Sequence, residues 1–368
     1  MFIPKLIVLT QDWVWNSKAI GQLVKKADFY PVSQGVENLI EKLQEKVNDG
    51  YSIFVFPEGS RSESMKIKRF HKGAFYLAQK LNLDIIPMVM NGTGDYIKKG
   101  ELLPKRSKIT VKFLDRISIN DASFGTNYTE RTKIIGRYFK SEFEKLKKEH
   151  YDTAYYKYKL INNYLYRGPV LEWYLKIKLR LEKNYKIFND LIPENCEIID
   201  IGCGYGFLTY MLSFLSGNRK ITGIDYDQKK IDIANNCPEK NNLINFICAD
   251  ITEYPVNKAD VYILSDVIHY LLKDKQEDLL VSCMNNLNPN GLIIIRDANK
   301  NLKKKHAGTY LTEFFSTNIG FNKTKNKLVF ISANDIINIA SKHNYDVKIF
   351  DNSIFTSNIF YIIKKKSY

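Results

Sequence analysis

The sequence predicts two α/β domains in tandem, the second with a seven-stranded, doubly wound sheet. Three observations lead to this fold class. The chain has 368 residues, more than the roughly 100 to 200 residues of an ordinary domain. Apolar runs of strand length alternate with helical patterns in both halves. A glycine-rich turn joins a strand to a helix early in the second half, where a doubly wound fold places its ligand.

The composition is that of a basic globular protein. Apolar residues make up 45% of the chain and charged residues 26%, which excludes global disorder. The formal net charge is +15, and Lys residues are spread through both halves. A basic surface suits phosphate-bearing partners, either anionic lipid headgroups or nucleic acid. The alternative interpretation is a general enrichment in Lys and Asn without a charged partner.

Cysteine usage and hydropathy bear on the compartment. The five cysteines all lie in the second half, with no CxxC pair and no histidine at metal-ligand spacing. This pattern predicts a reduced, cytoplasmic chain without a metal site. No apolar run approaches the roughly 18 residues that span a bilayer. Membrane contact is therefore expected to be peripheral, on the inner face, or supplied by another chain.

The first half alternates strands and helices. The expected strands are 5–9, 52–56, 84–90 and 108–113, and the expected helices are 35–48 and 73–81. A helical stretch rich in Lys, Tyr and Leu follows from about Glu130 to Asn189, broken once at Arg167 to Pro169. We place the domain boundary inside it. The domains are then 1–150 and 151–368, with 151–192 as the initial helical segment of the second.

A second series of strands and helices begins after Ile192. Its expected strands are 197–201, 220–224, 243–248, 260–264, 291–295, 346–350 and 358–363. Seven strands with interleaved helices predict a doubly wound sheet.

A glycine loop follows the first of these strands. The segment Glu197 to Gly206 reads EIIDIGCGYG, an apolar strand that runs into a loop and then into a helix at 207–215. Glycines there let the backbone approach a ligand closely. The GxGxG spacing, with Asp200 two residues before Gly202, favours an adenosylmethionine site over a dinucleotide site. Tight strand-to-helix turns without a ligand use glycine as well.

Acidic residues stand at the ends of the next two strands. Asp225 ends the second strand, 19 residues beyond Gly206, where a carboxylate can accept hydrogen bonds from both hydroxyls of a ribose. Asp250 follows the third strand in the same way. An acid after any one strand is commonplace, so the prediction rests on the three acids in this order.

These residues resemble those of class I S-adenosylmethionine-dependent methyltransferases, which have a Rossmann-like fold, and the resemblance covers the second half. It implies that the loop Gly202, Cys203, Gly204 and Gly206 holds the methionine part of S-adenosylmethionine. It also implies that Asp225 binds the ribose. The residues expected near the adenine are Asp250 and Ile251. The stretch LSDVIHYL matches the segment after the fourth strand, and LNPNG at 287–291 matches the turn before the fifth. Asp266 in the first of these stretches, and Asp200 before the glycine loop, are also expected to belong to the cofactor site.

His269 is the candidate catalytic residue. Methyl transfer mainly needs alignment of the acceptor and, in some cases, removal of its proton. His269 lies just beyond the fourth strand, where it could act as that base. The alternative is a structural histidine at the start of a helix, since many members of this class have no obvious base.

The first half resembles glycerophosphate and lysophosphatidate acyltransferases. The segment FPEGSRS at 56–62 is similar to that family's FPEGTRS block, and RFHKGA at 69–74 and IPM at 86–88 match two later blocks. The resemblance implies a phosphate-binding site formed by Glu58, Gly59, Arg61 and Lys72. The alternative is a turn with a surface salt bridge. An acyl donor would be acyl-CoA or acyl carrier protein.

One family feature is missing. The family activates its acceptor with a histidine and an aspartate in an NHxxxxD motif upstream of the glutamate block, yet no histidine precedes Phe56. His71 lies in a different block and is expected at the surface. We therefore describe domain 1–150 as a truncated acyltransferase-like domain. The whole chain resembles the tail of bacterial fusions of a transporter, an acyltransferase and a methyltransferase, so a partner chain could carry the missing pair, or the start could be misplaced.

Three functions follow from these observations. The first is a methyltransferase fused to an acyltransferase-like domain that acts on a lipid or lipid-linked small molecule. In the second, the first half is a non-catalytic module that docks on phospholipid or on an anionic membrane. The third is a nucleic-acid methyltransferase. It is disfavoured because the chain lacks a concentrated basic stripe with interleaved aromatics and the Asn-Pro-Pro-Tyr type of motif after the fourth strand.

Overall fold

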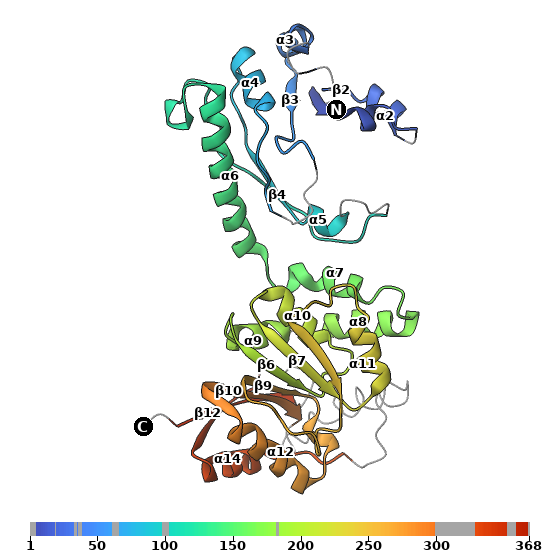
Figure 1. Cartoon of the computed structure of the whole chain (residues 1–368), viewed down its shortest axis with the longest axis vertical. Helices are drawn as coiled ribbons and strands as arrows, with labels where there is room; N and C mark the ends of the chain where they lie inside the picture. The colour runs from blue at the N-terminus through green and yellow to red at the C-terminus, as the bar shows by residue number, and fades with distance from the viewer. Residues whose placement is uncertain are drawn as a thin grey trace. The chain divides into compact units, whose positions relative to one another are not determined.

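The computed structural model divides the chain into two compact units, Met1–Tyr151 and Asp152–Tyr368. The structure describes residues 5–18, 20–32, 35, 39–60, 66–97, 103–181, 184–298, 328–351 and 358–366. Within these ranges, no helix combines the length and apolar character that a bilayer crossing requires. Each unit is an α/β structure (Figure 1). Each also has its own core of buried apolar side chains.

The N-terminal unit holds two small sheets. A parallel sheet of order β2-β1-β3 is formed by β1 (Leu6–Thr10), β2 (Phe29–Pro31) and β3 (Ser52–Phe54). An antiparallel pair is formed by β4 (Met88–Asn91) and β5 (Thr110–Phe113). The helices are α1 (Asp12–Trp15), α2 (Gly21–Lys26), α3 (Ile40–Asn48), α4 (Gly73–Lys80), α5 (Thr93–Tyr96) and α6 (Tyr128–His150), with a 3-10 turn η2 (Ala122–Phe124).

The expected strand over 84–90 proved shorter. β4 starts only at Met88, because Pro87 has no N–H to donate to a neighbouring strand; Ile85 makes an isolated bridge to Ile117 instead. The expected helix over 35–48 is seen from Ile40, and residues 36–38 lie outside the described residues.

The long helix α6 has a side-chain cap and a buried arginine. Asn127 accepts hydrogen bonds from the backbone N–H groups of Thr129 and Glu130, which satisfies donors that have no partner inside the helix. Arg131 is only 3% exposed and donates to backbone carbonyls between Ser118 and Gly125. The preceding loop is thereby fixed to the first turn of α6.

The C-terminal unit contains a seven-stranded sheet of order β11-β12-β10-β9-β6-β7-β8. Its strands are β6 (Glu197–Ile201), β7 (Lys220–Asp225), β8 (Ile244–Cys248), β9 (Ala259–Ser265), β10 (Leu287–Ala298), β11 (Tyr345–Phe350) and β12 (Asn358–Lys365). β12 runs antiparallel to both neighbours, and the pairs from β10 to β8 are parallel. The expected seven-stranded, Rossmann-like sheet is confirmed.

Helices cover both faces of this sheet (Figure 1). They are α7 (Thr153–Asn163), α8 (Pro169–Leu181), α9 (Asn184–Leu191), α10 (Phe207–Leu215), α11 (Gln228–Asn235), α12 (Lys273–Asn285) and α14 (Ala333–Lys342), with a 3-10 turn η3 (Ile268–Tyr270). One core cluster lies between α9, α10 and the sheet, and a larger one between α12, α14 and the opposite face. The expected break at Arg167 to Pro169 separates α7 from α8.

The strand order indicates at which edge of the sheet a ligand would bind. β6 is flanked by β7 on one side and β9 on the other, so the connections from β6 and from β9 diverge at this point. Ligands of doubly wound folds bind outside the carboxyl ends of the strands where the order reverses. The glycine loop leaves β6 at that edge.

Candidate functional site

Three glycines of the loop adopt backbone angles that favour glycine. Gly202, Gly204 and Gly206 have φ values of +72°, +56° and +77°. A Cβ on Gly202 would lie 2.4 Å from the Val267 side chain, and one on Gly206 would lie 2.6 Å from the Phe246 ring. A Cβ on Gly204 would meet no atom within 4 Å. The outer glycines are therefore required by packing, whereas Gly204 faces open space where a ligand can approach.

Asp225 connects this loop to the end of β7. Its carboxylate is 6% exposed and accepts hydrogen bonds from the backbone N–H of Gly204 at 2.8 Å and of Asp227 at 2.9 Å. Each carboxylate oxygen has a second acceptor position, so these bonds leave capacity for a ligand. Cys203 faces the same strand, and its Sγ would lie 2.8 Å from a Cβ on Gly223.

Asp200 lies beneath the loop. Its carboxyl group accepts a hydrogen bond from Thr209 Oγ1 at 2.6 Å and is 2% exposed. Burial, with a smaller effect of the nearby Asp225 charge, raises the pKa of Asp200 to about 7. A carboxyl group of this kind is partly protonated near neutral pH.

Asp250 and Ile251 stand after β8. The Asp250 carboxylate is exposed and accepts hydrogen bonds from the Thr252 N–H at 2.9 Å and from its hydroxyl at 2.8 Å. Ile251 is half-buried and packs against the core below α12 and α14. Asp225 and Cys248 are register partners on β7 and β8, so Asp250 follows two residues along the same edge of the sheet. Its predicted contact with the adenine stays a prediction.

The His269 side chain is buried and bonded to Asp297. It is 2% exposed, and Nδ1 lies 2.6 Å from Asp297 Oδ1 at the end of β10. The ring packs against Tyr270 and Phe330. Asp297 also accepts from the backbone N–H of His269 and of Ala298. The pair fixes η3 to β10, as a structural histidine would, and the role as a base stays a prediction.

Asp266 engages a buried arginine. The Asp266 carboxylate forms an ion pair with Arg296 of β10, whose side chain is 7% exposed. The backbone φ of Asp266 is +56°. Asp266 therefore has a partner within the protein, which sequence reasoning did not anticipate. The turn at Asn290 was anticipated, and the φ of +64° there is one that Asn tolerates.

Other residues near the loop were missed. Tyr164, at the end of α7, donates a 2.6 Å hydrogen bond to the Tyr205 carbonyl, which ties the initial helical segment to the loop. Lys230 of α11 is 7% exposed, and its Nζ lies 5.7 Å from the centre of the Tyr205 ring. Burial lowers the pKa of Lys230, while the charges of Asp225 and Asp227 raise it. No local sequence signal marks either residue, because long-range packing brings them to the loop.

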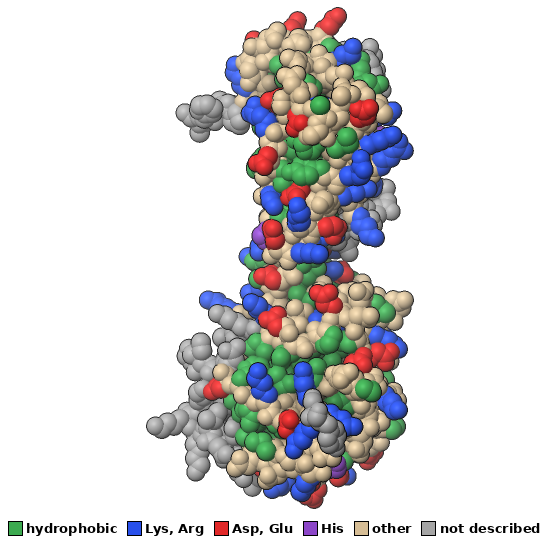
Figure 2. All heavy atoms as spheres, turned by 90° about the vertical axis from the view of Figure 1, so that its left-hand side faces the viewer, with side chains coloured by type: hydrophobic (Ala, Val, Ile, Leu, Met, Phe, Trp, Pro, Cys, Tyr) green, Lys and Arg blue, Asp and Glu red, His purple; other side chains and the backbone are tan. Residues whose placement is uncertain are grey.

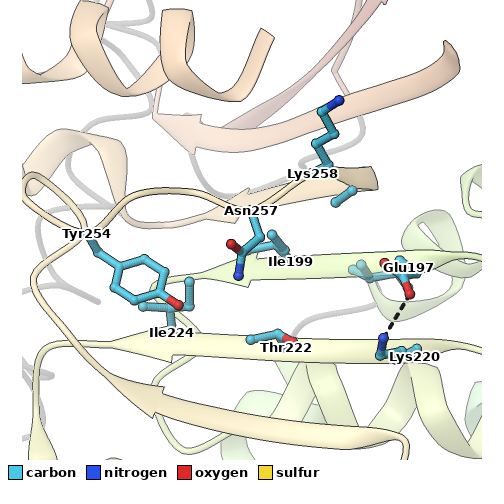
Figure 3. Close-up of a pocket in the computed structure, with 10 residues that line it drawn as sticks. Glu197, Ile199, Lys220, Thr222, Ile224, Tyr254, Asn257 and Lys258 are labelled. Carbon is cyan, nitrogen blue, oxygen red and sulfur yellow. Dashed lines mark hydrogen bonds and ion pairs between the residues drawn. The ribbon is translucent and has the colours of Figure 1, made fainter. Parts of the chain in front are cut away.

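A hollow lies along β6 and β7, from Glu197 and Lys220 at their amino ends to Ile224 near the carboxyl end of β7 (Figure 3). Glu197 and Lys220, at the amino ends of β6 and β7, form a 2.9 Å ion pair beside it. Tyr254 and Asn257 border it from the β8–β9 connection, residues 249–258, which the structure describes throughout and which contains turns but no helix. None of the residues that line this hollow belongs to the glycine loop.

In the N-terminal unit, Glu58 fixes its own loop. Glu58 Oε2 accepts a 2.7 Å hydrogen bond from the Lys68 backbone N–H. Gly59 has a φ of +66°, and a Cβ there would lie 2.9 Å from the ring of His71, which is exposed as expected. Lys72 is exposed at the start of α4. Arg61 lies outside the described residues.

Two family models match the chain. Residues 192–355 match the model described as a methyltransferase domain, and residues 3–91 match the model described as an acyltransferase. The first match falls on the Rossmann-like sheet that carries the glycine loop and its acids. This half of the chain is a methyltransferase domain of the S-adenosylmethionine-dependent class.

Relatives match each half separately. A 1-acyl-sn-glycerol-3-phosphate acyltransferase from Cocos nucifera is 34% identical over 126 residues, which cover 32% of this chain and 41% of the relative. A carboxy-S-adenosyl-L-methionine synthase from Campylobacter concisus is 26% identical over 115 residues, covering 31% and 49%. The chain thus spans less than half the length of each of these relatives. It combines an acyltransferase domain with a methyltransferase domain.

Two solved methyltransferase structures are similar to this chain over about half of its length or more. Human N-acetylserotonin methyltransferase in complex with S-adenosylmethionine has a TM-score of 0.42 and 20% identity, over 55% of this chain and 58% of the other. Magnesium protoporphyrin IX methyltransferase from Synechocystis has a TM-score of 0.40 and 14% identity, over 60% and 98%.

Proposed function

We propose that the C-terminal half transfers the methyl group of S-adenosylmethionine to a lipid or a lipid-linked small molecule. The observation that carries the methyl-donor site is the loop from Gly202 to Gly206, with Asp225 bonded to its centre at Gly204. When bound, S-adenosylmethionine supplies a methyl group on a sulfonium, which is a good leaving group. The protein mainly has to bind and align the donor and the acceptor.

The residues at the loop suit the donor's chemistry. Gly204 offers backbone without a side chain to the methionine part, and the open space above it meets the need for close approach. The remaining acceptor positions of Asp225 suit the two ribose hydroxyls. Asp250, which is exposed after the next strand, and the apolar Ile251 beside it suit the polar edge and the face of the adenine.

The lipid character of the acceptor is inferred from the other half of the chain. The relatives that match this half are named for acylation of a glycerol phosphate, and the net charge of +15 suits phosphate-bearing molecules. Glu58, Gly59, Arg61 and Lys72 are the residues proposed to bind that phosphate. Glu58 would act by holding the loop, since its carboxylate already accepts from the Lys68 backbone.

Calorimetric titration of the full chain with S-adenosylmethionine tests the donor site. We expect Asp225→Ala to weaken binding at least tenfold, a loss of about 1.4 kcal/mol. Asp232→Ala, which removes an exposed carboxylate on α11, is the matched control and should leave affinity unchanged. Absence of binding to the parent chain, or an equal loss in both variants, would refute the assignment.

The acceptor class is tested separately. The full chain is incubated with methyl-labelled S-adenosylmethionine and a total bacterial lipid extract, and beside it with the water-soluble fraction of the same cells. We expect label in the lipid phase, and less of it with Asp225→Ala. Label that appears only in the water-soluble fraction would disprove the lipid acceptor while leaving the donor site intact.

A further inference from the structure

A strongly basic groove lies in the N-terminal unit between α6 and the segment that leads into α4. We call it the basic groove and define it by its lining residues, which are Lys68, Arg69, Phe70, Lys72, Thr129, Thr132, Lys133, Gly136, Arg137 and Lys140. Six of these ten residues are Lys or Arg and none is acidic. In the space-filling view, Lys and Arg side chains gather on the N-terminal unit (Figure 2).

The two walls of the groove have separate origins. Lys133, Arg137 and Lys140 follow one another at the spacings of four and three residues that place side chains on one face of a helix. The other wall is the segment that leads into α4, with Arg69 and Lys72. Gly136 of α6 faces the Phe70 ring, since a Cβ at Gly136 would lie at an ordinary contact distance of 3.6 Å from that ring. The groove floor is therefore apolar and its walls are cationic.

The charges of this groove are largely left without acidic partners. Among the described residues, no ion pair involves Arg69, Lys72, Arg137 or Lys140. Two acids of α6 pair with lysines outside the groove: Glu142 pairs with Lys145 and Lys112, and Glu144 pairs with Lys147. Glu130 exerts some attraction on Lys133, and Lys68 Nζ donates to Ser60 Oγ. Because cations line this groove without acidic residues among them, the groove attracts anionic ligands.

We propose that the basic groove binds phosphate headgroups of anionic phospholipid and docks the N-terminal unit on a membrane surface. Arg69, Lys72, Lys133, Arg137 and Lys140 are all exposed. Cations that project from two separate elements can contact several headgroups of a lipid surface at once. The site extends the predicted role of Lys72 to α6, and it does not depend on methyl transfer, which belongs to the other unit.

The lining also argues against nucleic acid. Proteins that bind single strands provide exposed aromatic rings on which bases stack. The one aromatic residue of the groove, Phe70, is 5% exposed and packs against Phe75 and Phe139. Its ring is part of the core and offers no stacking surface.

Vesicle flotation of the full chain tests the proposal. Phosphatidylcholine vesicles with and without phosphatidate are compared for the parent and for Arg69→Gln/Arg137→Gln/Lys140→Gln. The matched control is Lys18→Gln/Lys42→Gln/Lys148→Gln, which removes three exposed cations of the same unit outside the groove. We expect the groove variant to lose about fivefold in partitioning for each cation removed, the equivalent of about 1 kcal/mol each, and the control to change less than twofold. Thermal unfolding of both variants checks that they are folded.

Each outcome decides the question. Selective loss in the groove variant, together with binding that falls as salt rises, supports the proposal. Equal loss in both variants would show attraction by net charge alone and overturn it. The proposal would also be overturned if the parent chain did not bind vesicles that contain phosphatidate. Binding of inorganic phosphate or a labelled oligonucleotide that the groove variant abolishes, with vesicle binding unaffected, would assign the groove to a different ligand and overturn the lipid proposal.

Discussion

Asp200, two residues before the glycine loop, has a buried carboxyl group whose protonation changes near neutral pH. Its carboxyl group is buried beside Thr209, and burial raises its pKa to about 7 from an ordinary value of 3.8. In the folded chain the group therefore keeps its proton to a higher pH than in the unfolded chain. Between these two pKa values the folded state binds more protons, so the free energy of unfolding falls as pH rises.

We expect Asp200→Asn to remove this dependence. The amide oxygen can still accept from the Thr209 hydroxyl, and it does not ionise. Relative to the parent, the variant should gain stability as pH rises from about 4 to about 7, by at most about 1.4 kcal/mol per pH unit. Denaturant unfolding of the C-terminal unit at several pH values measures the difference. A stability difference that does not change with pH would contradict the raised pKa.

At the residue scale, the sequence predicted where site residues lie along the strands but not which groups their side chains bond to. Asp225 was predicted to end its strand at the ligand edge, and it does. That its carboxylate also accepts from Gly204 was not predictable, because the two residues are 21 positions apart. The same holds for Asp266 and Arg296, which meet only when β9 and β10 pair.

At the scale of elements, two glycines of the loop are needed for different reasons, Gly206 for packing and Gly204 for the approach of a ligand. Gly206 is closed in by Phe246, whereas the space around Gly204 is open, and both have positive φ values. We expect Gly206→Ala to cost about 1–3 kcal/mol through overpacking, in addition to about 1–2 kcal/mol from its backbone angle. Gly204→Ala should cost the backbone contribution alone. Chemical denaturation of both variants measures this contrast.

For ligand binding we expect the opposite order, with the larger loss of S-adenosylmethionine affinity in Gly204→Ala. A methyl group on Gly204 would occupy the space proposed for the methionine part of the ligand. Calorimetric titration of the two folded variants measures their affinities. Unchanged affinity in Gly204→Ala would argue that the ligand does not pass over Gly204.

Element boundaries were predictable where local signals agreed. β6 and α10 have the expected bounds, because an apolar run and glycines mark their shared turn. β10 runs from Leu287 to Ala298, well beyond the expected 291–295. An irregularity in its pairing with β9, between Leu287 and Leu292, lets the strand continue past Pro289. Such irregularities depend on the neighbouring strand and leave little trace in the local sequence.

For the whole molecule, the number of strands followed from the sequence, while their order followed from long-range pairing. Hydrophobic runs and turn signals were sufficient to count seven strands in the second half. Nothing in those runs indicates that β12 inserts between β10 and β11 and runs antiparallel to both. The sequence placed a domain boundary at residues 150 and 151, and the folded chain has separate cores on either side of Tyr151.

Separate cores and separate ligand sites predict separate responses to S-adenosylmethionine. The ligand binds folded Asp152–Tyr368 under our proposal, and a ligand at a hundred times its Kd adds about 2.7 kcal/mol to the stability of the state that it binds. For a unit of this size that corresponds to a rise in Tm of roughly 5–10 °C. Calorimetric melting of the full chain should show one transition that moves and one that does not, and Asp225→Ala should abolish the shift. If both transitions moved together, the two units would unfold as one cooperative block, because stabilisation of one would then be shared by the other.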